Sequence, residues 1–367
     1  MNILILNWRD IKNPKAGGAE IILYELSKRL IKEGHSIIWF CSSFDEALSQ
    51  ETFEGIRIIR RGNKFSVYLE ALWYYKQLSE KPDIVLDCVN TICWQTPFYV
   101  ERQKRILYAN QSARRVFFYE YPWPFALLGF LLEPLQYLSY KKTKAICYSD
   151  SIKNDLISFG LSKENISVFP LGIDHARYNP GKKFGQPTFI FVGRFVKNKR
   201  PDLVVMSLKT VAKKYPLAHV YLVGYGEEEK NLQSLIISTG LEKNVFIVNK
   251  NNVFFAKDKK DMKVTLMQAA WAIIVPSVKE GWGMVVTEAA SCGTPAIVSN
   301  VTGLRDSVLH NKTGIILSCD PTPQELSKAM LTLIEDAGFR NRLEKGAILW
   351  SKKFSWESSF EAFKKLL

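Results

Sequence analysis

Short apolar runs alternate with longer amphipathic stretches along most of the chain, in one set before and another after a Gly- and Pro-rich stretch. The runs of the first set are Ile3–Asn7, Ser36–Cys41, Ile56–Arg60, Asp83–Asp87, Arg105–Ala109 and Ala145–Tyr148. The runs of the second set are Thr188–Val192, His219–Val223, Val245–Val248, Ala272–Val275, Pro295–Ser299 and Gly314–Leu317. Apolar runs separated by helical patterns, such as residues 19–33, are typical of parallel strands that helices cover on both faces.

The restart of the pattern predicts two domains in the 367 residues. The stretch Leu171–Pro187 is the best candidate for the linker because it is rich in Gly and Pro. We expect an α/β fold of two Rossmann-like, doubly wound domains that face each other across a cleft, with the site in that cleft. The expected N-terminal domain is 1–178, the C-terminal domain is 179–350, and 351–367 is a helix that returns to the N-terminal domain.

Composition narrows the class of protein. With 47% hydrophobic and 23% charged residues the chain is globular rather than disordered. The net charge is +14, and the residues after Pro180 contribute +10 of it. This excess fits an anionic ligand or surface there, and a solvated basic face without a specific partner fits it equally well. No nucleic-acid-binding motif accompanies the charge. The six cysteines include no C-x-x-C pair, which argues against a disulfide scaffold and a zinc site.

The segment Tyr121–Tyr140 has a single charged residue, Glu133, and its charge-free part is too short to span a bilayer. Basic residues flank it on both sides, within 114–144. Two interpretations stay open: a peripheral contact of 114–144 with an anionic membrane, or a helix packed on its own sheet. The N-terminus has no signal-peptide pattern, so we expect a cytoplasmic location, with possible contact at the inner membrane face.

Two of the candidate sites follow predicted strands. Gly17 and Gly18 stand between the first strand and the first helix, where backbone amides attract phosphate, although a plain turn would use the same residues. Arg194 follows the strand 188–192, and Lys199 stands near the start of the next helix. Two cations at the mouth of a sheet can hold a diphosphate that gains charge as it departs.

The third candidate is the stretch 277–288, in which a strand leads into a Glu-Gly-x-Gly loop and a helix. Seven residues separate Glu280, on the loop, from Glu288, inside the helix. The glycines let backbone amides face a phosphate at the positive end of the helix, and the carboxylates suit neutral hydroxyls of a sugar and a ribose. The residues of this loop are Gly281, Trp282, Gly283, Met284 and Val285. A glycosidase-like carboxylate pair is the rival interpretation, but it would need both groups to flank one bond.

Taken together these motifs resemble the retaining nucleotide-sugar glycosyltransferases of family four, which have the GT-B architecture. The resemblance extends over almost the whole chain. It rests on Gly17–Glu20, Ser149–Leu156, Pro170–Asp174, Val192–Arg194, Val223–Glu227 and the Glu-x7-Glu block within Pro276–Val308.

The resemblance implies a role for each candidate residue. Arg194 and Lys199 would neutralise the departing diphosphate, and Glu280 with the amides after Gly281 would hold the donor sugar. Glu288 would bind ribose hydroxyls. Gly17 and Gly18 would approach the phosphates from the opposite domain when the cleft closes.

The sequence also departs from the family pattern. A histidine that many relatives carry near the donor sugar is absent from Tyr108–Ser112, and the usual Gly-Gly-x-x-Glu is Thr302-Gly303-Leu304-Arg305-Asp306. These departures bear on sugar recognition rather than on the reaction class.

The implied function is transfer of a hexose from a UDP or GDP sugar to an acceptor hydroxyl, with retained configuration. The acceptor would be a glycan or a lipid-linked saccharide, in glycoconjugate or cell-surface polysaccharide assembly. No metal is required, because cationic side chains supply the positive charge. The alternatives are a sugar-nucleotide hydrolase or epimerase of the same architecture and a non-enzymatic sugar-nucleotide binder.

Overall fold

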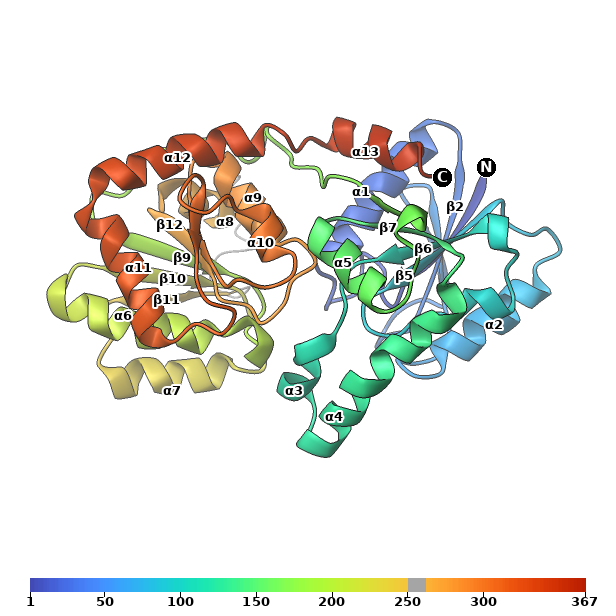
Figure 1. Ribbon diagram of the computed structural model, residues 1–367, viewed down its shortest axis with the longest axis horizontal. Helices are drawn as coiled ribbons and strands as arrows, with labels where there is room; N and C mark the ends of the chain where they lie inside the picture. Colours follow the sequence, from blue (N-terminus) through green and yellow to red (C-terminus); the bar gives the residue numbers. More distant parts are fainter. Residues whose placement is uncertain (250–261) are drawn as a thin grey trace. The chain divides into compact units, whose positions relative to one another are not determined.

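The computed structural model describes residues 1–249 and 262–367, which fall into two compact units. Unit 1 comprises Met1–Phe117, Pro122–Gly172 and Trp356–Leu367, and unit 2 comprises Phe118–Tyr121 and Ile173–Ser355. Each unit is built around its own sheet, with helices on both faces (Figure 1). The predicted α/β class with two Rossmann-like parallel sheets is confirmed.

The sheet of unit 1 has eight strands in the order β3-β4-β2-β1-β5-β6-β7-β8. All neighbouring strands are parallel except β3 and β4. The strands are β1 (Asn2–Leu6), β2 (Ser36–Cys41), β3 (Gln50–Phe53), β4 (Ile56–Arg60), β5 (Ile84–Val89), β6 (Arg105–Ala109), β7 (Lys144–Cys147) and β8 (Ile166–Val168). The order reverses between β1 and β5, as in other doubly wound folds.

The helices of unit 1 cover this sheet, and short 3₁₀ turns join them to it. The α-helices are α1 (Gly18–Lys32), α2 (Val67–Gln77), α4 (Trp123–Leu132), α5 (Asp150–Ser158) and α13 (Trp356–Lys364). The 3₁₀ turns are η1 (Thr96–Phe98), η2 (Arg102–Lys104), η3 (Arg114–Val116), η4 (Glu133–Tyr140) and η5 (Lys163–Asn165). The short helix α3 (Phe117–Glu120) begins at the boundary of the unit.

Strands β3 and β8 were not expected from the sequence. The four residues of β3 do not form an apolar run. Exposed and half-buried residues alternate along the strand. It forms an antiparallel hairpin with β4 through Glu54 and Gly55, whose φ angles are 47° and 83°. Two successive positive φ values are the geometry of a tight two-residue hairpin turn. A polar edge strand of this kind leaves little hydrophobic signal in the sequence.

The sheet of unit 2 has six strands, all parallel, in the order β11-β10-β9-β12-β13-β14. They are β9 (Thr188–Val192), β10 (His219–Val223), β11 (Val245–Val248), β12 (Ala272–Val275), β13 (Ala296–Val298) and β14 (Gly314–Ile316). The helical segments are η6 (Lys197–Lys199), α6 (Pro201–Lys214), α7 (Glu229–Thr239), α8 (Met262–Ala269), α9 (Met284–Ser291), α10 (Leu304–Ser307), α11 (Pro323–Glu335) and α12 (Ala337–Ser351).

Alternation along the strands of unit 2 builds two apolar layers. Phe189 and Phe191 of β9 and Val220 and Leu222 of β10 join a core with α6, α7 and α11. Successive side chains of a strand point to opposite faces, so Ile190 lies on the other face of the sheet. There α8, α9 and α12 provide the cover (Figure 1). Both faces are therefore buried, which explains the continuous apolar runs.

Among the residues that the structure describes, no helix combines the length and the apolar character that crossing a lipid bilayer demands.

Lys183, in the segment that leads into β9, is half-buried within unit 2. Its Nζ donates a hydrogen bond to Thr294 Oγ1 at 2.5 Å. Burial lowers the pKa of Lys183 to about 8, although Glu344 opposes the shift, and burial raises the pKa of Glu344 and of Cys292. The ammonium form of Lys183 is therefore costly in the folded protein.

This cost predicts a pH dependence of stability. Between pH 8 and the ordinary lysine value of 10.5, the unfolded chain binds a proton at Lys183 that the folded chain has released. The contribution of Lys183 to the free energy of unfolding should therefore rise with pH across this window, by up to about 3 kcal/mol relative to a variant without this amine. Urea unfolding of the wild type, compared with Lys183→Met, measures it. Lys182→Met is the exposed control, and equal slopes for all three proteins would contradict the prediction.

Candidate functional site

The candidate residues of unit 2 follow two strands that are neighbours in the sheet. β9 pairs with β12 in parallel, so their carboxyl ends lie side by side. Arg194 follows β9 and Glu280 follows β12, which places both on the same edge of the sheet. The sequence order alone separates these residues widely, and the strand pairing brings their loops together. This edge is where doubly wound sheets bind ligands.

The turn that carries Arg194 is fixed by an adjacent glycine loop. A Cβ on Gly224 would lie 1.9 Å from the Gly193 carbonyl oxygen, and a Cβ on Gly226 would lie 2.3 Å from that of Phe195. The Phe195 amide donates to the Tyr225 carbonyl at 2.8 Å. This close approach excludes larger residues at both glycines. Above it the Arg194 side chain is exposed, and no ion pair joins it to any residue that the structure describes.

Lys199 and Glu280 meet directly. Lys199 Nζ forms an ion pair with Glu280 Oε1, and Ser277 Oγ donates to the same oxygen at 3.0 Å. The backbone supports this contact, since the Val278 amide donates to the Asn198 carbonyl at 2.9 Å. Both charged side chains are less than one-fifth exposed. The pair joins the loop after β9 to the loop after β12, and a ligand anion that reaches Lys199 must compete with Glu280.

Two glycines interlock beneath Glu280. Gly283, at the N-terminus of α9, has a φ of 88°, and Gly303, before α10, has a φ of 82°. A Cβ on Gly303 would lie 2.4 Å from the Glu280 carbonyl oxygen, and a Cβ on Gly283 would lie 2.6 Å from Leu304 Cδ2. Both positions favour glycine for conformation as well as for space. Together they set the path of the loop that includes Gly281 and the start of the helix at Met284 and Val285.

Glu288 lies on α9, in a polar cluster that the sequence did not reveal. Its Oε2 forms an ion pair with Lys263 Nζ at 2.7 Å, and Lys263 also donates to the Tyr178 hydroxyl at 3.0 Å. Burial lowers the pKa of Lys263, but Glu288 and Tyr178 outweigh it and the net pKa is raised. Burial and Glu288 raise the pKa of Tyr178 to about 12. One of the two carboxylate oxygens of Glu288 is therefore already used by Lys263.

Lys263 and Tyr178 had no distinguishing signal in the sequence. Lys263 stands on α8 near several other lysines, and Tyr178 lies in the expected linker, so neither formed part of a motif. Their role follows only from packing, which brings both side chains to Glu288.

Trp282 is an unusual member of the loop. The residue is 7% exposed, its ring lies edge-on to Phe354, and its Nε1 has no hydrogen-bond partner among the described residues. A buried indole N–H without a partner costs free energy. At the C-terminal end of α9, His175 forms hydrogen bonds with Ser291 Oγ and with the Phe354 carbonyl. The histidine is therefore used in packing α9 against the end of α12.

Gly17 and Gly18 lie in unit 1, at the N-terminus of α1. The Gly17 amide donates to Glu20 Oε2 at 2.7 Å, and Asn7 Nδ2 donates to Glu20 Oε1 at 3.3 Å. Glu20 is buried and thus occupies the amide that a phosphate would meet. A ligand at Gly17 has to replace this internal acceptor, while the first-turn dipole still favours negative charge.

A buried ion pair holds the loop before Gly17. Arg60 of β4 binds Asp10 through Nε at 2.7 Å and Nη2 at 3.0 Å, and both side chains are fully buried. Burial pushes the pKa of Asp10 upward, but the hydrogen bonds and charge of Arg60 outweigh it and lower the pKa. The loop is therefore anchored to the sheet by a bidentate contact.

At the carboxyl end of β6, Asn110 stands in the stretch that lacks the family histidine. Asn110 is buried, its Oδ1 accepts from the Tyr148 hydroxyl, and its Nδ2 has no partner among the described residues. The unit therefore presents an unsatisfied amide donor there instead of an imidazole.

Two Rossmann-like sheets, with cations and carboxylates after the strands of the second, define a two-domain α/β protein of the doubly wound class. The profile of Glycosyltransferase Family 4 matches residues 16–177, and that of Glycosyl transferases group 1 matches residues 173–350. Together the two profiles cover almost the whole chain. The chain belongs to the family 4 glycosyltransferases, with an N-terminal part that matches the first profile and a C-terminal part that matches the group 1 profile.

Curated relatives support this assignment at modest identity. An uncharacterized glycosyltransferase of Methanocaldococcus jannaschii is 28% identical over 63% of this chain and 61% of its own length. The D-inositol 3-phosphate glycosyltransferase of Acidothermus cellulolyticus is 27% identical over 55% of this chain and 48% of its own length. A phosphatidylinositol N-acetylglucosaminyltransferase polypeptide of Homo sapiens is 24% identical over 88% of this chain and 66% of its own length. The chain thus spans about half to two-thirds of the length of these relatives.

Solved structures share the fold along the whole chain. A sucrose-phosphate synthase from Thermosynechococcus elongatus has a TM-score of 0.78 at 18% identity, with 100% of this chain and 98% of that chain covered. Anabaena HepE, in complex with UDP-glucose, has a TM-score of 0.73 at 18% identity, with 100% and 99% covered. At this identity the similarity establishes the architecture and nothing finer.

The interlock at Gly303 generates a prediction. Gly303→Ala adds a Cβ that overlaps the Glu280 carbonyl and forces a positive φ on alanine, so it should destabilise unit 2 by about 1–3 kcal/mol. The matched control is Gly185→Ala, where a Cβ meets no atom within 4 Å and φ is not positive. Thermal unfolding measures the difference, and equal melting temperatures for the two variants would contradict the interpretation.

Proposed function

We propose that this protein is a retaining glycosyltransferase that moves a hexose from a UDP or GDP sugar to an acceptor hydroxyl. The observation that carries the proposal is the Lys199–Glu280 ion pair beside the exposed Arg194, at the carboxyl ends of two adjacent parallel strands. Family membership supports glycosyl transfer, and the complex of Anabaena HepE with UDP-glucose supports a nucleoside diphosphate sugar as donor.

Donor binding would rearrange the charges of this edge. A diphosphate is a stronger partner for Lys199 than a single carboxylate, and Arg194 adds a planar set of donors for phosphate oxygens. The diphosphate would then take Lys199 from Glu280. The freed Glu280 carboxylate becomes an acceptor for hydroxyls of the donor sugar, together with the amides that follow Gly281. Glu288, whose Oε2 is bound by Lys263, would use its other oxygen for a ribose hydroxyl.

The transfer step exchanges two bonds at the anomeric carbon. The bond from that carbon to the β-phosphate oxygen breaks, and a bond to the acceptor oxygen forms on the same face. The acceptor proton passes to the departing phosphate oxygen, so atoms and charge balance without a protein nucleophile. Arg194 and Lys199 would lower the barrier because negative charge grows on the diphosphate as it leaves. Positioning of the acceptor provides the remaining rate enhancement.

The cationic side chains would also supply the charge for which other phosphate-transfer sites use a divalent metal ion. We therefore propose that turnover needs no metal.

The acceptor would be a glycan or a lipid-linked saccharide, in glycoconjugate or cell-surface polysaccharide assembly. A human relative carries phosphatidylinositol in its name, which supports an acceptor with a lipid part. The apolar segment after residue 121, with basic residues on both sides, supports a peripheral contact with the inner face of an anionic membrane through 114–144.

A sugar-nucleotide hydrolase or epimerase and a non-enzymatic sugar-nucleotide binder are the alternative functions. Each would use the same phosphate contacts, so only the products separate them from transfer.

Product analysis provides the first test of the function. Purified protein is incubated with UDP and GDP sugars and membrane lipid extract, with and without EDTA, and the products are followed by NMR. We expect a new α-linked glycoside from an α-linked donor, at equal rates with EDTA. Free hexose, or an isomerised donor without acceptor, would instead favour the hydrolase or the epimerase.

Arg194→Ala provides the second test. Removal of one charge contact to the leaving group should lower kcat by about 100-fold, because such contacts act mainly in the transition state. The fold should persist, since the Arg194 side chain is exposed. Arg342→Ala removes another exposed arginine of unit 2 and should leave kcat unchanged. Near-normal turnover of Arg194→Ala would refute the assigned role.

A further inference from the structure

The segment formed by α4 and η4 of unit 1 exposes large apolar side chains: α4 (Trp123–Leu132) contains no polar residue, and η4 turns its polar residues inward and its leucines outward. Helices on a protein surface normally turn their apolar side inward and their polar side to water. Here seven large apolar side chains are between 48% and 70% exposed. They are Trp123, Phe125, Leu128, Leu131, Leu132, Leu135 and Leu138, and we call them the apolar face of 123–138. In Figure 1 the helix α4 projects from the body of unit 1.

The inward side of η4 carries the polar groups. In a 3₁₀ helix, side chains three residues apart eclipse one another, so Leu132, Leu135 and Leu138 form one outward row. On the inward side, Glu133 accepts hydrogen bonds from the backbone amides of Ala113 and Arg114, at 2.6 and 2.7 Å.

Two further inward residues of η4, Gln136 and Tyr140, also form hydrogen bonds with the body of unit 1. Gln136 accepts from the Cys93 amide at 2.7 Å and donates to the Thr91 carbonyl at 2.9 Å. The Tyr140 hydroxyl donates to Asp87, a fully buried carboxylate whose pKa is raised by burial. These bonds fix the rotation of the segment and hold the leucines outward. The exposure of the apolar face is therefore built into the fold.

Positive charge surrounds the apolar face. Residues 101–144 contain eight Lys and Arg against three Glu, and one of the three, Glu133, is buried. Arg115 is exposed before the segment, and Lys141 and Lys142 are exposed directly after it. Lys141 continues the outward row of Leu132, Leu135 and Leu138 at the same three-residue spacing.

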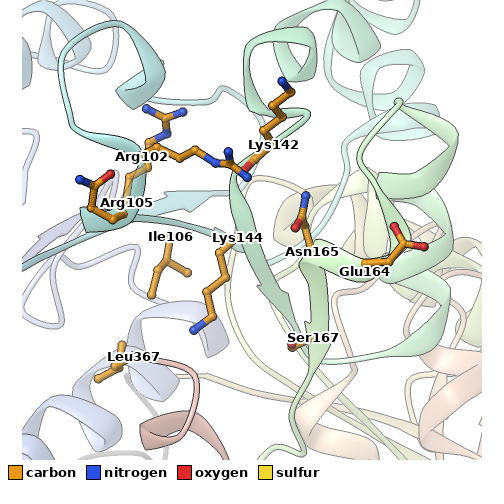
Figure 2. Close-up of a pocket in the computed structure, with 10 residues that line it drawn as sticks. Arg102, Arg105, Ile106, Lys142, Lys144, Glu164, Asn165, Ser167 and Leu367 are labelled. Carbon is orange, nitrogen blue, oxygen red and sulfur yellow. The ribbon is translucent and has the colours of Figure 1, made fainter.

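A cavity of about 570 Å³ lies next to Lys142 and is lined by further basic residues. It lies at the amino ends of β6, β7 and β8, and its cationic lining residues are Arg102, Arg105, Lys142 and Lys144 (Figure 2). Arg102 Nε donates to the Lys142 carbonyl at 2.8 Å, which ties the cavity to the end of η4. Burial and the charge of Arg102 both lower the pKa of Arg105. An anion in the cavity would relieve this cost.

We propose that the apolar face of 123–138 seats unit 1 in the plane of an anionic lipid bilayer. The leucines and aromatic rings enter the boundary between headgroups and acyl chains, and Lys141, Lys142 and Arg102 meet the lipid phosphates. An amphipathic segment with a basic margin binds anionic lipid in this way. The charge complementarity selects a lipid surface as occupant, because a second copy of the chain would bring the same positive charge to the interface.

This inference deepens the proposed function by naming the surface that would meet a lipid-linked acceptor. Its test measures lipid binding without donor or acceptor. A wild type that binds donor but does not bind lipid would overturn this inference alone. A wild type that binds lipid but does not bind donor would overturn the proposed function alone.

The test is flotation of the full chain with vesicles of phosphatidylcholine and phosphatidylglycerol, against vesicles of phosphatidylcholine only. We expect the wild type to float with the anionic vesicles and to be released by salt. The double substitution Leu128→Glu and Leu135→Glu should reduce partitioning by about tenfold per leucine. Ile237→Glu with Leu349→Glu, at two exposed apolar positions of unit 2, is the matched control and should bind as the wild type does.

A second variant keeps the test decisive if the leucine variant fails to fold. Lys141→Glu with Lys142→Glu should weaken binding to anionic vesicles by about fivefold or more per lysine and leave the melting temperature unchanged. No flotation of folded wild type, or equal flotation of all variants, would overturn the proposal. Sedimentation identifies the other occupant: a wild-type dimer that Leu128→Glu and Leu135→Glu convert to monomer would also overturn it.

Discussion

The parallel pairing of β9 with β12 is the constraint on which the site of unit 2 depends. It aligns the carboxyl ends of two strands that lie far apart in sequence and lets Lys199 reach Glu280. Each of these two charges neutralises the other, so neither Lys199 nor Glu280 is left without a partner of opposite charge. The neighbouring pairings, β9 with β10 and β12 with β13, bring the loops after these strands so close together that glycine is required at 224, 226 and 303. The glycines are a consequence of the packing as much as of any ligand.

Much of the fold was predictable because buried parallel strands leave continuous apolar runs. β9, β10 and β12 were expected at the positions where they occur. β3 was missed, because its stability comes from a hairpin turn and from pairing with β4 rather than from buried side chains. Register and strand order depend on contacts between distant segments, which a hydrophobic pattern does not encode.

The site was predictable at the level of single loops and not at the level of contacts. The sequence indicated Lys199 and Glu280 as separate candidates, but it did not show that one neutralises the other. Lys263 was missed altogether, since its partner Glu288 lies on another element and the pair forms only by packing. The segment after residue 121 is a similar case. Its composition left a core helix and a surface helix as open interpretations, and the inward bonds of Glu133 and Gln136 determine which side is outward.

Unit 1 depends on residues 356–367, which follow unit 2 in the chain. The final helix, α13, lies within unit 1, where Phe363 contacts Tyr108 and Phe169 and Trp356 lies so close to Gly172 that a Cβ there would be 2.4 Å from the indole ring. The polypeptide therefore returns to unit 1 after it has completed unit 2. A ribosome must therefore synthesise all of unit 2 before residues 356–367 can complete the aromatic layer of unit 1, so the N-terminal part of the chain cannot finish folding until those residues have been made.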